Sequence, residues 1–402
     1  MYIRHQPLFS FETLLEYQPK TRLALLFEIL DFHPCLKALP AKSIRGPKGF
    51  SAESMLRALV AKQLYQIPTF SQLVERLEQD LSFAYDCGFS LCEARPSIPT
   101  FSRFFQRLSQ TGALEALFDS LVQRVRDEHL VTGEAVAIDS SQIDAYEHAQ
   151  PKSKLPDDDN TATWGAKRDT HGNQITWFGY KLHVAVDAKS ELPLSLVVTP
   201  AHRHDSTQAI PVMDRLPFQP QAYCLDMGYD TKQIYDRIQC RGAKAIIPLN
   251  RRGEQQPPAG LDENRTPVCS MGYPMVYWGA DSKRGELKFR CPHVCGKVNC
   301  PQGSAWCSSS NYGLVVKQKV AKDPRSFCLP HRTSRNWKEL YNLRTSVERV
   351  FSRLKGYLGA NALKVRGIKK VTAHLTLCCI LLLAGTLALH HHKAKSITQK
   401  IS

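Results

Sequence analysis

Residues 341–355 read YNLRTSVERVFSRLK and form the most informative segment of the chain. On a helix with about 100° per residue, Tyr341, Arg344, Glu348 and Lys355 fall within about 60° of one another. Apolar side chains fill the adjacent arc, so the predicted helix packs on a core and places an acid among cations along its border. A solvated helix with charge pairs four residues apart would explain Arg344 and Glu348, but not why Tyr341 and Lys355 share their line.

Two further acids follow short apolar strands earlier in the chain. Asp139 comes directly after AVAI, and Asp226 directly after AYCL. Each has a second acid close by, because Asp144 and Asp230 follow within five residues. We expect Asp144 to lie beyond its strand and Asp230 to cap the helix that begins TKQ. Asp139 and Asp226 are therefore the acids that directly follow the two predicted strands.

The predicted secondary structure changes several times along the chain. Residues 45–130 read as helices, with an N-cap at Ser51, a capping box at Thr69 and another N-cap at Thr100. Short strands and helices alternate afterwards, with a hairpin that turns at residues 189–191 and a polar loop over 151–169. A single helix is expected from Arg335 to about residue 357. The pattern divides the chain into five regions: a lead-in (1–44), a helical segment (45–130), an α/β segment (131–250 and 330–392), a cysteine-rich insertion (251–329) and a tail (393–402).

The helix that begins near Thr100 carries Arg103 and Arg107 one turn apart, away from its phenylalanine stripe. Such a pair suits DNA phosphates in a small helical DNA-binding unit. An ordinary helical bundle with solvated arginines fits the same residues.

The spacing Tyr341-x2-Arg344-x3-Glu348-x6-Lys355 resembles the Y-R-E-K signature of DDE transposases from bacterial insertion sequences. Other segments agree in order. AIDSSQIDA resembles the family's first-aspartate strand, LDMGYD its second-aspartate segment, and GYKLHVAVDAKSELPLSLVVTPAHRHDS its central hairpin. KVRGIKKVTAHLTLCCILLLA resembles its closing helix. The resemblance covers roughly residues 45–250 and 331–390, and the cysteine-rich stretch falls where the family often carries an insertion.

The resemblance implies an α/β fold: an RNase H-like catalytic core with a mixed sheet and flanking helices, an all-α N-terminal domain and a β-rich insertion. It implies that Asp139, Asp226 and Glu348 are catalytic and hold two Mg²⁺ or Mn²⁺ ions. Such ions clamp the attacking and leaving oxygens of a phosphodiester, and carboxylate oxygens suit Mg²⁺. Tyr341 and the basic residues Arg344 and Lys355 would then contact DNA.

The implied function is that of a DNA transposase, which binds element ends and target as double-stranded DNA and catalyses strand cleavage and strand transfer. A homodimer in the synaptic complex is expected. An inactive or domesticated relative that acts as a sequence-specific DNA-binding protein, or a nuclease, is the alternative. The complete set of acids argues against decay and against a protein that only binds DNA.

Thirteen cysteines without a secretory signal indicate a reducing compartment. The cysteines of residues 251–329 suit a structural zinc ion held by four thiolates, or by three and a histidine such as His293, although their spacing lacks a clean pair of CxxC motifs. Reduced thiols in a β-rich insertion are the alternative. The candidate ligands are Cys269, Cys291, Cys295, Cys300 and Cys307.

The formal net charge is +16, and residues 331–402 hold 14 Lys and Arg against two acids, so this segment contributes 14 − 2 = +12. A local positive field of this size favours a nucleic-acid partner. The apolar stretch Thr372–Leu389 has the length of a membrane span but is interrupted by His374 and Gly385. We expect a buried core helix, no membrane partner, and a cytoplasmic, nucleoid-associated bacterial protein.

Overall fold

The computed structural model describes residue 13 and residues 19–40, 49–90, 92–155, 159–168, 171–281 and 283–401, with side chains described up to residue 393. The chain divides into two compact units. One contains residues 1–129, 142–180 and 352–402, and the other contains residues 130–141 and 181–351.

Helices dominate the first unit: α2 (Arg22–Ile29), α3 (His33–Ala38), α4 (Ala52–Leu64), α5 (Phe70–Gln79), α6 (Leu81–Asp86), α7 (Ile98–Leu108), α8 (Ala113–Asp127) and α13 (Ile368–Ile401). Local capping chemistry sets several of their starts. The Ser51 hydroxyl accepts from the backbone N–H of Ser54, and Thr69 forms a reciprocal capping box with Gln72. These two predicted caps are confirmed.

The predicted cap at Thr100 is wrong. Helix α7 begins at Ile98 with Ser97 as N-cap, and Thr100 lies inside the first turn, 3.0 Å from the Ser97 hydroxyl. Proline explains the difference. Pro99 occupies the first turn, where its missing N–H leaves no bond unmade and its fixed φ favours the helix.

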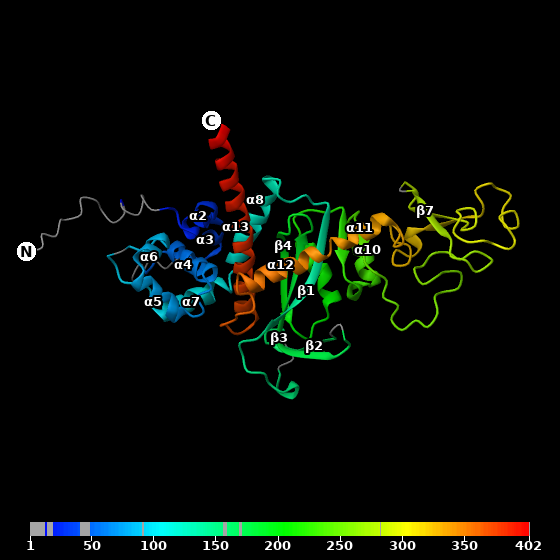
Figure 1. Ribbon diagram of the computed structural model, residues 1–402. Helices are drawn as coiled ribbons and strands as arrows, with labels where there is room; N and C mark the ends of the chain where they lie inside the picture. Colours follow the sequence, from blue (N-terminus) through cyan, green and yellow to red (C-terminus); the bar gives the residue numbers. More distant parts are fainter. Residues whose placement is uncertain are drawn as a thin grey trace, which may run out of the picture. The chain divides into compact units, whose positions relative to one another are not determined.

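Helix α13 runs through the helical unit and packs against α2, α4 and α8 (Figure 1). Its segment Ile368–Lys393 is long and apolar enough to cross a membrane, but 72% of its most apolar window is buried inside the protein. This burial favours the core helix that the sequence predicts. Beside it, Gln63 donates to the carbonyl of Leu358 at 2.5 Å, which joins α4 to the chain before α13.

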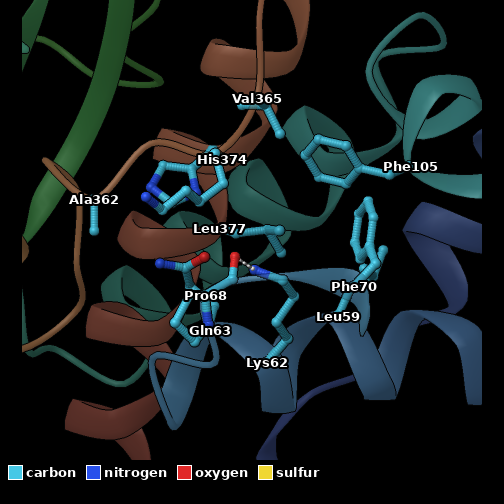
Figure 2. A pocket seen from close by; sticks show the side chains of 11 residues that line it. Leu59, Lys62, Gln63, Pro68, Phe70, Phe105, Ala362, Val365, His374 and Leu377 are labelled. Carbon is cyan, nitrogen blue, oxygen red and sulfur yellow. Dashed lines mark hydrogen bonds between the residues drawn. The ribbon is translucent and has the colours of Figure 1, made fainter. Parts of the chain in front are cut away.

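A small cavity of about 30 Å³ lies between α4, α5, α7 and α13 (Figure 2). The Lys62 ammonium donates to the carbonyl of Pro68 at 3.1 Å, and burial lowers its pKa to about 8. His374 faces the same cavity, and its Nε2 lies 3.1 Å from the carbonyl of Gly359. Each buried polar group shown here thus has a backbone partner.

Six strands form a mixed sheet in the order β2-β3-β1-β5-β6, with β4 paired to β3. Strands β1, β5 and β6 are parallel neighbours, and β2 and β3 are antiparallel. Helices α9 and α10 and the short η2 follow β4 and β5 (Figure 1). The bounds are β1 Ala135–Asp144, β2 Thr163–Arg168, β3 Gln174–Asp187, β4 Pro193–Pro200, α9 Asp205–Asp214, β5 Ala222–Leu225, η2 Met227–Tyr229, α10 Lys232–Cys240 and β6 Lys244–Ile246, with η1 at Lys152–Lys154.

Two local expectations about this sheet are wrong. Strand β1 continues to Asp144 instead of ending at Asp139. Residues 163–168 of the expected loop form strand β2, which pairs with residues 174–179. The strand lies at the edge of the sheet, and its sequence, TWGAKR, lacks the apolar pattern of an inner strand.

The cysteine-rich insertion contains a three-stranded antiparallel sheet of β7 (Val276–Asp281), β8 (Glu286–Arg290) and β9 (Val315–Lys319), followed by η3 (Val320–Lys322). Its apolar centre consists of Met275, Leu287, Phe289 and Phe327. The sheet therefore has a small core of its own.

The expected helix from Arg335 to residue 357 is broken in two, α11 (Arg335–Asn342) and α12 (Thr345–Gly356). At the junction the backbone N–H groups of Arg344 and Ser346 bond three residues back instead of four. The tightened turn ends the helical register at Leu343. Tyr341 and Glu348 therefore belong to different helices, and the prediction of one continuous helix is wrong.

Candidate active site

Asp139 and Asp226 lie side by side because of strand register. In the parallel pair β1 and β5, Ile138 is the partner of Leu225, and each aspartate is the next residue. Adjacent strands are about 4.8 Å apart, so this register places both carboxyl groups at one edge of the pair. Asp139 is partly buried, whereas Asp226 is exposed.

Helix α11 packs on β5 and precedes the turn and helix α12, which contains the third acid, Glu348. Trp337 packs in a buried cluster with Ala222 and Cys224 of β5, and the Cys224 thiol donates to the carbonyl of Leu340 at 3.2 Å. The tight turn follows at once, and α12 begins with Glu348 in its first turn. Packing on β5 therefore fixes where the turn starts.

Arg344 connects the acids across this turn. Its guanidinium donates to Glu348 at 2.7 Å and to Asp139 at 3.5 Å. The Arg344 side chain is 18% exposed, and Glu348 is 53% exposed. A single cation therefore lies between two acids that are 209 residues apart in the chain.

The electrostatic setting of Asp139 is unusual. Burial, together with the nearby carboxylates of Asp226 and Asp205, raises the pKa of its carboxyl to about 7. The backbone N–H of Ser140, which donates at 2.8 Å, and the Arg344 guanidinium act in the opposite direction. Several acids thus share a site where negative charge is costly, which is the setting in which a cation is bound.

Sequence reasoning did not anticipate Asp205 as a neighbour of this site. Asp205 is the first residue of α9, whose N-cap is His204, with its Nδ1 3.3 Å from the N–H of Ser206. The Asp205 carboxylate pairs with Lys181 of β3 at 2.9 Å. Only the pairing of β3 with the neighbouring strands could have shown this.

Asp144 and Asp230, the second acids near Asp139 and Asp226 in the sequence, are held by structural contacts. Asp144 is exposed at the end of β1 and accepts from Gln142 at 2.8 Å. Asp230 is fully buried, where it accepts from Arg325 at 2.9 Å and from the N–H of Asn250 at 2.8 Å. The predicted cap at Asp230 is wrong, because Thr231 is the N-cap of α10.

The other candidate DNA-binding residues lie in different surroundings. Tyr341 stacks on Trp337 with ring centroids 5.0 Å apart, and the Arg344 guanidinium lies 6.0 Å from its ring. Lys355 belongs to the other compact unit, where it donates to the carbonyl of Gln142 at 2.8 Å. Arg103 and Arg107 are both exposed on α7.

The chemistry of these donors suits a hard divalent cation, because carboxylate oxygens are the protein ligands that Mg²⁺ and Mn²⁺ prefer. In the part of the chain that the structure describes, no three His, Cys, Asp or Glu side chains lie close enough together to hold an ion. The carboxylates of Asp139 and Glu348 are instead both paired with the Arg344 guanidinium. The roles of the three acids as metal ligands therefore stay a prediction.

Two family models match the chain. Residues 132–384 match the transposase DDE domain, and residues 12–107 match a second transposase domain (DUF772). The first match covers more than half of the chain, and the protein therefore belongs to the DDE transposase family. It is a DNA transposase, an enzyme that cleaves DNA and transfers strands with divalent metal ions.

A solved structure is also similar, the cryo-EM structure of the piggyBac transposase synaptic complex with hairpin DNA. The TM-score is 0.41 and the sequence identity 10%, over 93% of this chain and 76% of that chain. The family assignment depends on the two family models and not on this similarity.

Proposed function

We propose that Asp139, Asp226 and Glu348 are the catalytic acids of this transposase and that they hold two divalent ions, Mg²⁺ or Mn²⁺. The observation that carries the proposal is the register of β1 and β5, which places Asp139 beside Asp226, together with the Arg344 bridge from Asp139 to Glu348. When bound, the ions would stabilise charge on the phosphate and lower the pKa of an attacking oxygen.

The protein's own residues would position the DNA around this centre. Arg344 would leave the carboxylates where bound cations neutralised their charge, and its planar guanidinium suits a phosphate next to the scissile bond. Tyr341, held by its stack on Trp337, offers a hydroxyl and a ring face to the same strand. Lys355 and the exposed pair Arg103 and Arg107 would contact phosphates further along the DNA.

The proposal extends to the domains of the chain and to its assembly. The sheet order, with parallel β1, β5 and β6 beside antiparallel strands, supports an RNase H-like core. The helical segment 45–130 would bind element ends, the catalytic residues would lie in 131–250 and 330–392, and the insertion 251–329 would hold a structural zinc ion. A homodimer in the synaptic complex and a nucleoid-associated bacterial setting complete the proposal.

Charge-neutral variants of the acids test the catalytic assignment. Asp139→Asn, Asp226→Asn and Glu348→Gln should each lower strand cleavage of DNA carrying the element ends by at least about 100-fold, because each loses several kcal/mol of transition-state stabilisation. Binding of the same DNA should stay equal or become tighter, because negative charge near phosphate is removed. Cleavage with Mg²⁺ or Mn²⁺ and gel-shift binding are measured on the same preparations.

Asp144→Asn is the matched control, because this exposed acid lies at the end of the same strand and accepts a hydrogen bond from Gln142. It should retain cleavage. If a folded Glu348→Gln protein cleaves as well as the unchanged protein, the assignment of Glu348 is wrong. Loss of binding together with cleavage would favour a structural role for the acids, and absence of cleavage by the unchanged protein would favour an inactive DNA-binding relative.

A further inference from the structure

We infer that the insertion binds one zinc ion through Cys269, Cys291, Cys300 and Cys307, and not through Cys295. The assignment rests on the proposal that the insertion holds a structural zinc ion, and it selects four thiols from the five candidates. It concerns a site separate from the catalytic acids.

A single small cavity carries the assignment. Its lining includes the four named cysteines, and its volume is about 10 Å³. A space of this size holds about one water-sized sphere, and so it has room for one ion. The rest of the described lining is mainly apolar or aromatic, with no Asp or Glu: Met271, Tyr273, Pro292, Val298, Trp306 and Leu314, with Ser270 and His293. Thiolates in an apolar shell are the surroundings of a structural Cys₄ zinc site.

The backbone holds three of the four cysteines in place. Cys269 and Cys300 each begin a Cys-x-x-Gly turn, in which the glycine N–H donates back to the cysteine carbonyl at 2.9 and 3.0 Å. Both glycines have positive φ, 81° at Gly272 and 64° at Gly303, a conformation that other residues rarely adopt. Cys291 follows β8, and its N–H donates to the carbonyl of Leu314 at 2.9 Å.

The thiols lie around the cavity, but among the described residues no three side chains converge to metal-binding distance. A cysteine side chain reaches a new position by rotation about χ1 alone. For an ion to bind in the cavity, the four thiols must turn inward and lose their protons. Zinc accepts thiolates readily, and four of them satisfy its tetrahedral preference.

The other sulfur and nitrogen groups are excluded by their positions. Cys295 does not line the cavity, and its backbone N–H donates to the carbonyl of Cys291 at 3.2 Å. Cys328 is 2% exposed and packs in a different cluster, with Trp337. His293 lines the cavity, but its Nδ1 lies 3.2 Å from the N–H of Cys300 and 3.3 Å from the carbonyl of Val298. We assign it as a positioning residue that holds the Cys300 turn.

Zinc content and cobalt spectra of the full chain test the ligand set. The unchanged protein should carry one zinc per chain by elemental mass spectrometry. Replacement of zinc by Co²⁺ should give thiolate-to-metal charge-transfer bands with the intense visible bands of a tetrahedral site. Cys269→Ser, Cys291→Ser, Cys300→Ser and Cys307→Ser should each lose most of the bound metal. Cys295→Ser, the matched control in the same insertion, should keep one zinc and an unchanged cobalt spectrum.

Alkylation of the unchanged protein keeps the test decisive if a serine variant fails to fold. Cys269, Cys300 and Cys307 should be protected while zinc is bound and should be alkylated after chelation, as mapped by mass spectrometry. Cys295 should react equally in both states. Metal-free purified protein, or loss of zinc in Cys295→Ser with retention in Cys269→Ser, would overturn the assignment. Zinc is measured without DNA, so this test does not depend on cleavage. A protein that carries zinc but does not cleave DNA would contradict the proposed catalysis and would still support the zinc site.

Discussion

At the scale of single residues, Arg344 is the most informative side chain. It donates to Glu348 at 2.7 Å and to Asp139 at 3.5 Å, so it competes with any cation for the same two carboxylates. Its role in the free protein therefore differs from its proposed role on DNA.

Arg344→Gln should tighten Mn²⁺ binding to the DNA-free protein roughly two- to fivefold, because a partly solvated charge pair of about 0.5–1 kcal/mol no longer has to be broken. The same variant should cleave element-end DNA more slowly, since a phosphate contact is lost. Titration followed by electron paramagnetic resonance measures the free ion. Arg349→Gln removes an equal charge from α12, the helix that follows Arg344, where Arg349 pairs with Glu191, and it should leave Mn²⁺ affinity unchanged. Equal Mn²⁺ affinity in the Arg344 variant and the unchanged protein would show that the bridge does not hold in solution.

At the scale of the elements, the sequence predicts what local chemistry controls. The caps at Ser51 and Thr69 and the hairpin turn at residues 189–191 depend on neighbours within a few positions, and they are where the pattern indicates. No glycine or proline lies at the break at Leu343, so the local sequence does not predict that the helix ends there. It depends on how α11 packs on β5, a contact between residues more than 100 positions apart.

In the candidate site too, local patterns predict some features and long-range packing determines the others. Periodicity identifies Glu348 and Arg344 as neighbours, and the ends of apolar runs identify Asp139 and Asp226. The register that sets the two aspartates side by side, and the approach of Asp205, belong to strand pairing that no local pattern encodes. Among the cysteines, spacing did not separate Cys295 from the rest, whereas the lining of one cavity does.

Strand contact predicts a sharp substitution effect at Gly179 of β3. An added Cβ there would lie 2.1 Å from the carbonyl oxygen of Ile143 and 2.8 Å from the backbone N of Ala145. Since backbone cannot move aside cheaply, Gly179→Ala should lower the free energy of unfolding by about 1–3 kcal/mol. Gly385→Ala in α13 is the control, because an added Cβ meets nothing within 4 Å and a helix favours alanine by about 1 kcal/mol. Denaturant titration should give opposite signs, and a stable Gly179→Ala protein would contradict the described contact between β1 and β3.

At the scale of the whole molecule, buried histidines predict the response to acid. Burial lowers the pKa of His183, His331 and His374 to about 4 in the folded protein, whereas an unfolded chain has the ordinary value near 6.5. Between these values the unfolded state binds more protons, so stability rises with pH there. Stability should be fully present above pH 6.5 and fall as the pH drops from 6.5 to 4, by up to about 3 kcal/mol for each histidine.

Thermal unfolding across this pH range measures the effect. His374→Gln keeps a hydrogen-bonding side chain beside the carbonyl of Gly359 but cannot take up the proton, so its loss of stability with acid should be shallower. An identical slope in the variant and the unchanged protein would mean that His374 is not buried as a neutral ring.

The pairing of Ile138 with Leu225 has a consequence for how such a chain tolerates change. The distance between Asp139 and Asp226 is set by one step across a sheet, and the 86 residues between them have no part in setting it. Loops that leave the sheet and return to it can therefore lengthen, shorten or acquire a module of their own without disturbing the chemistry. The cysteine-rich insertion is one such addition, placed after β6 and before α11. The permissive positions of this enzyme, for grafting a foreign domain or trimming a natural one, are then the connections outside the paired residues.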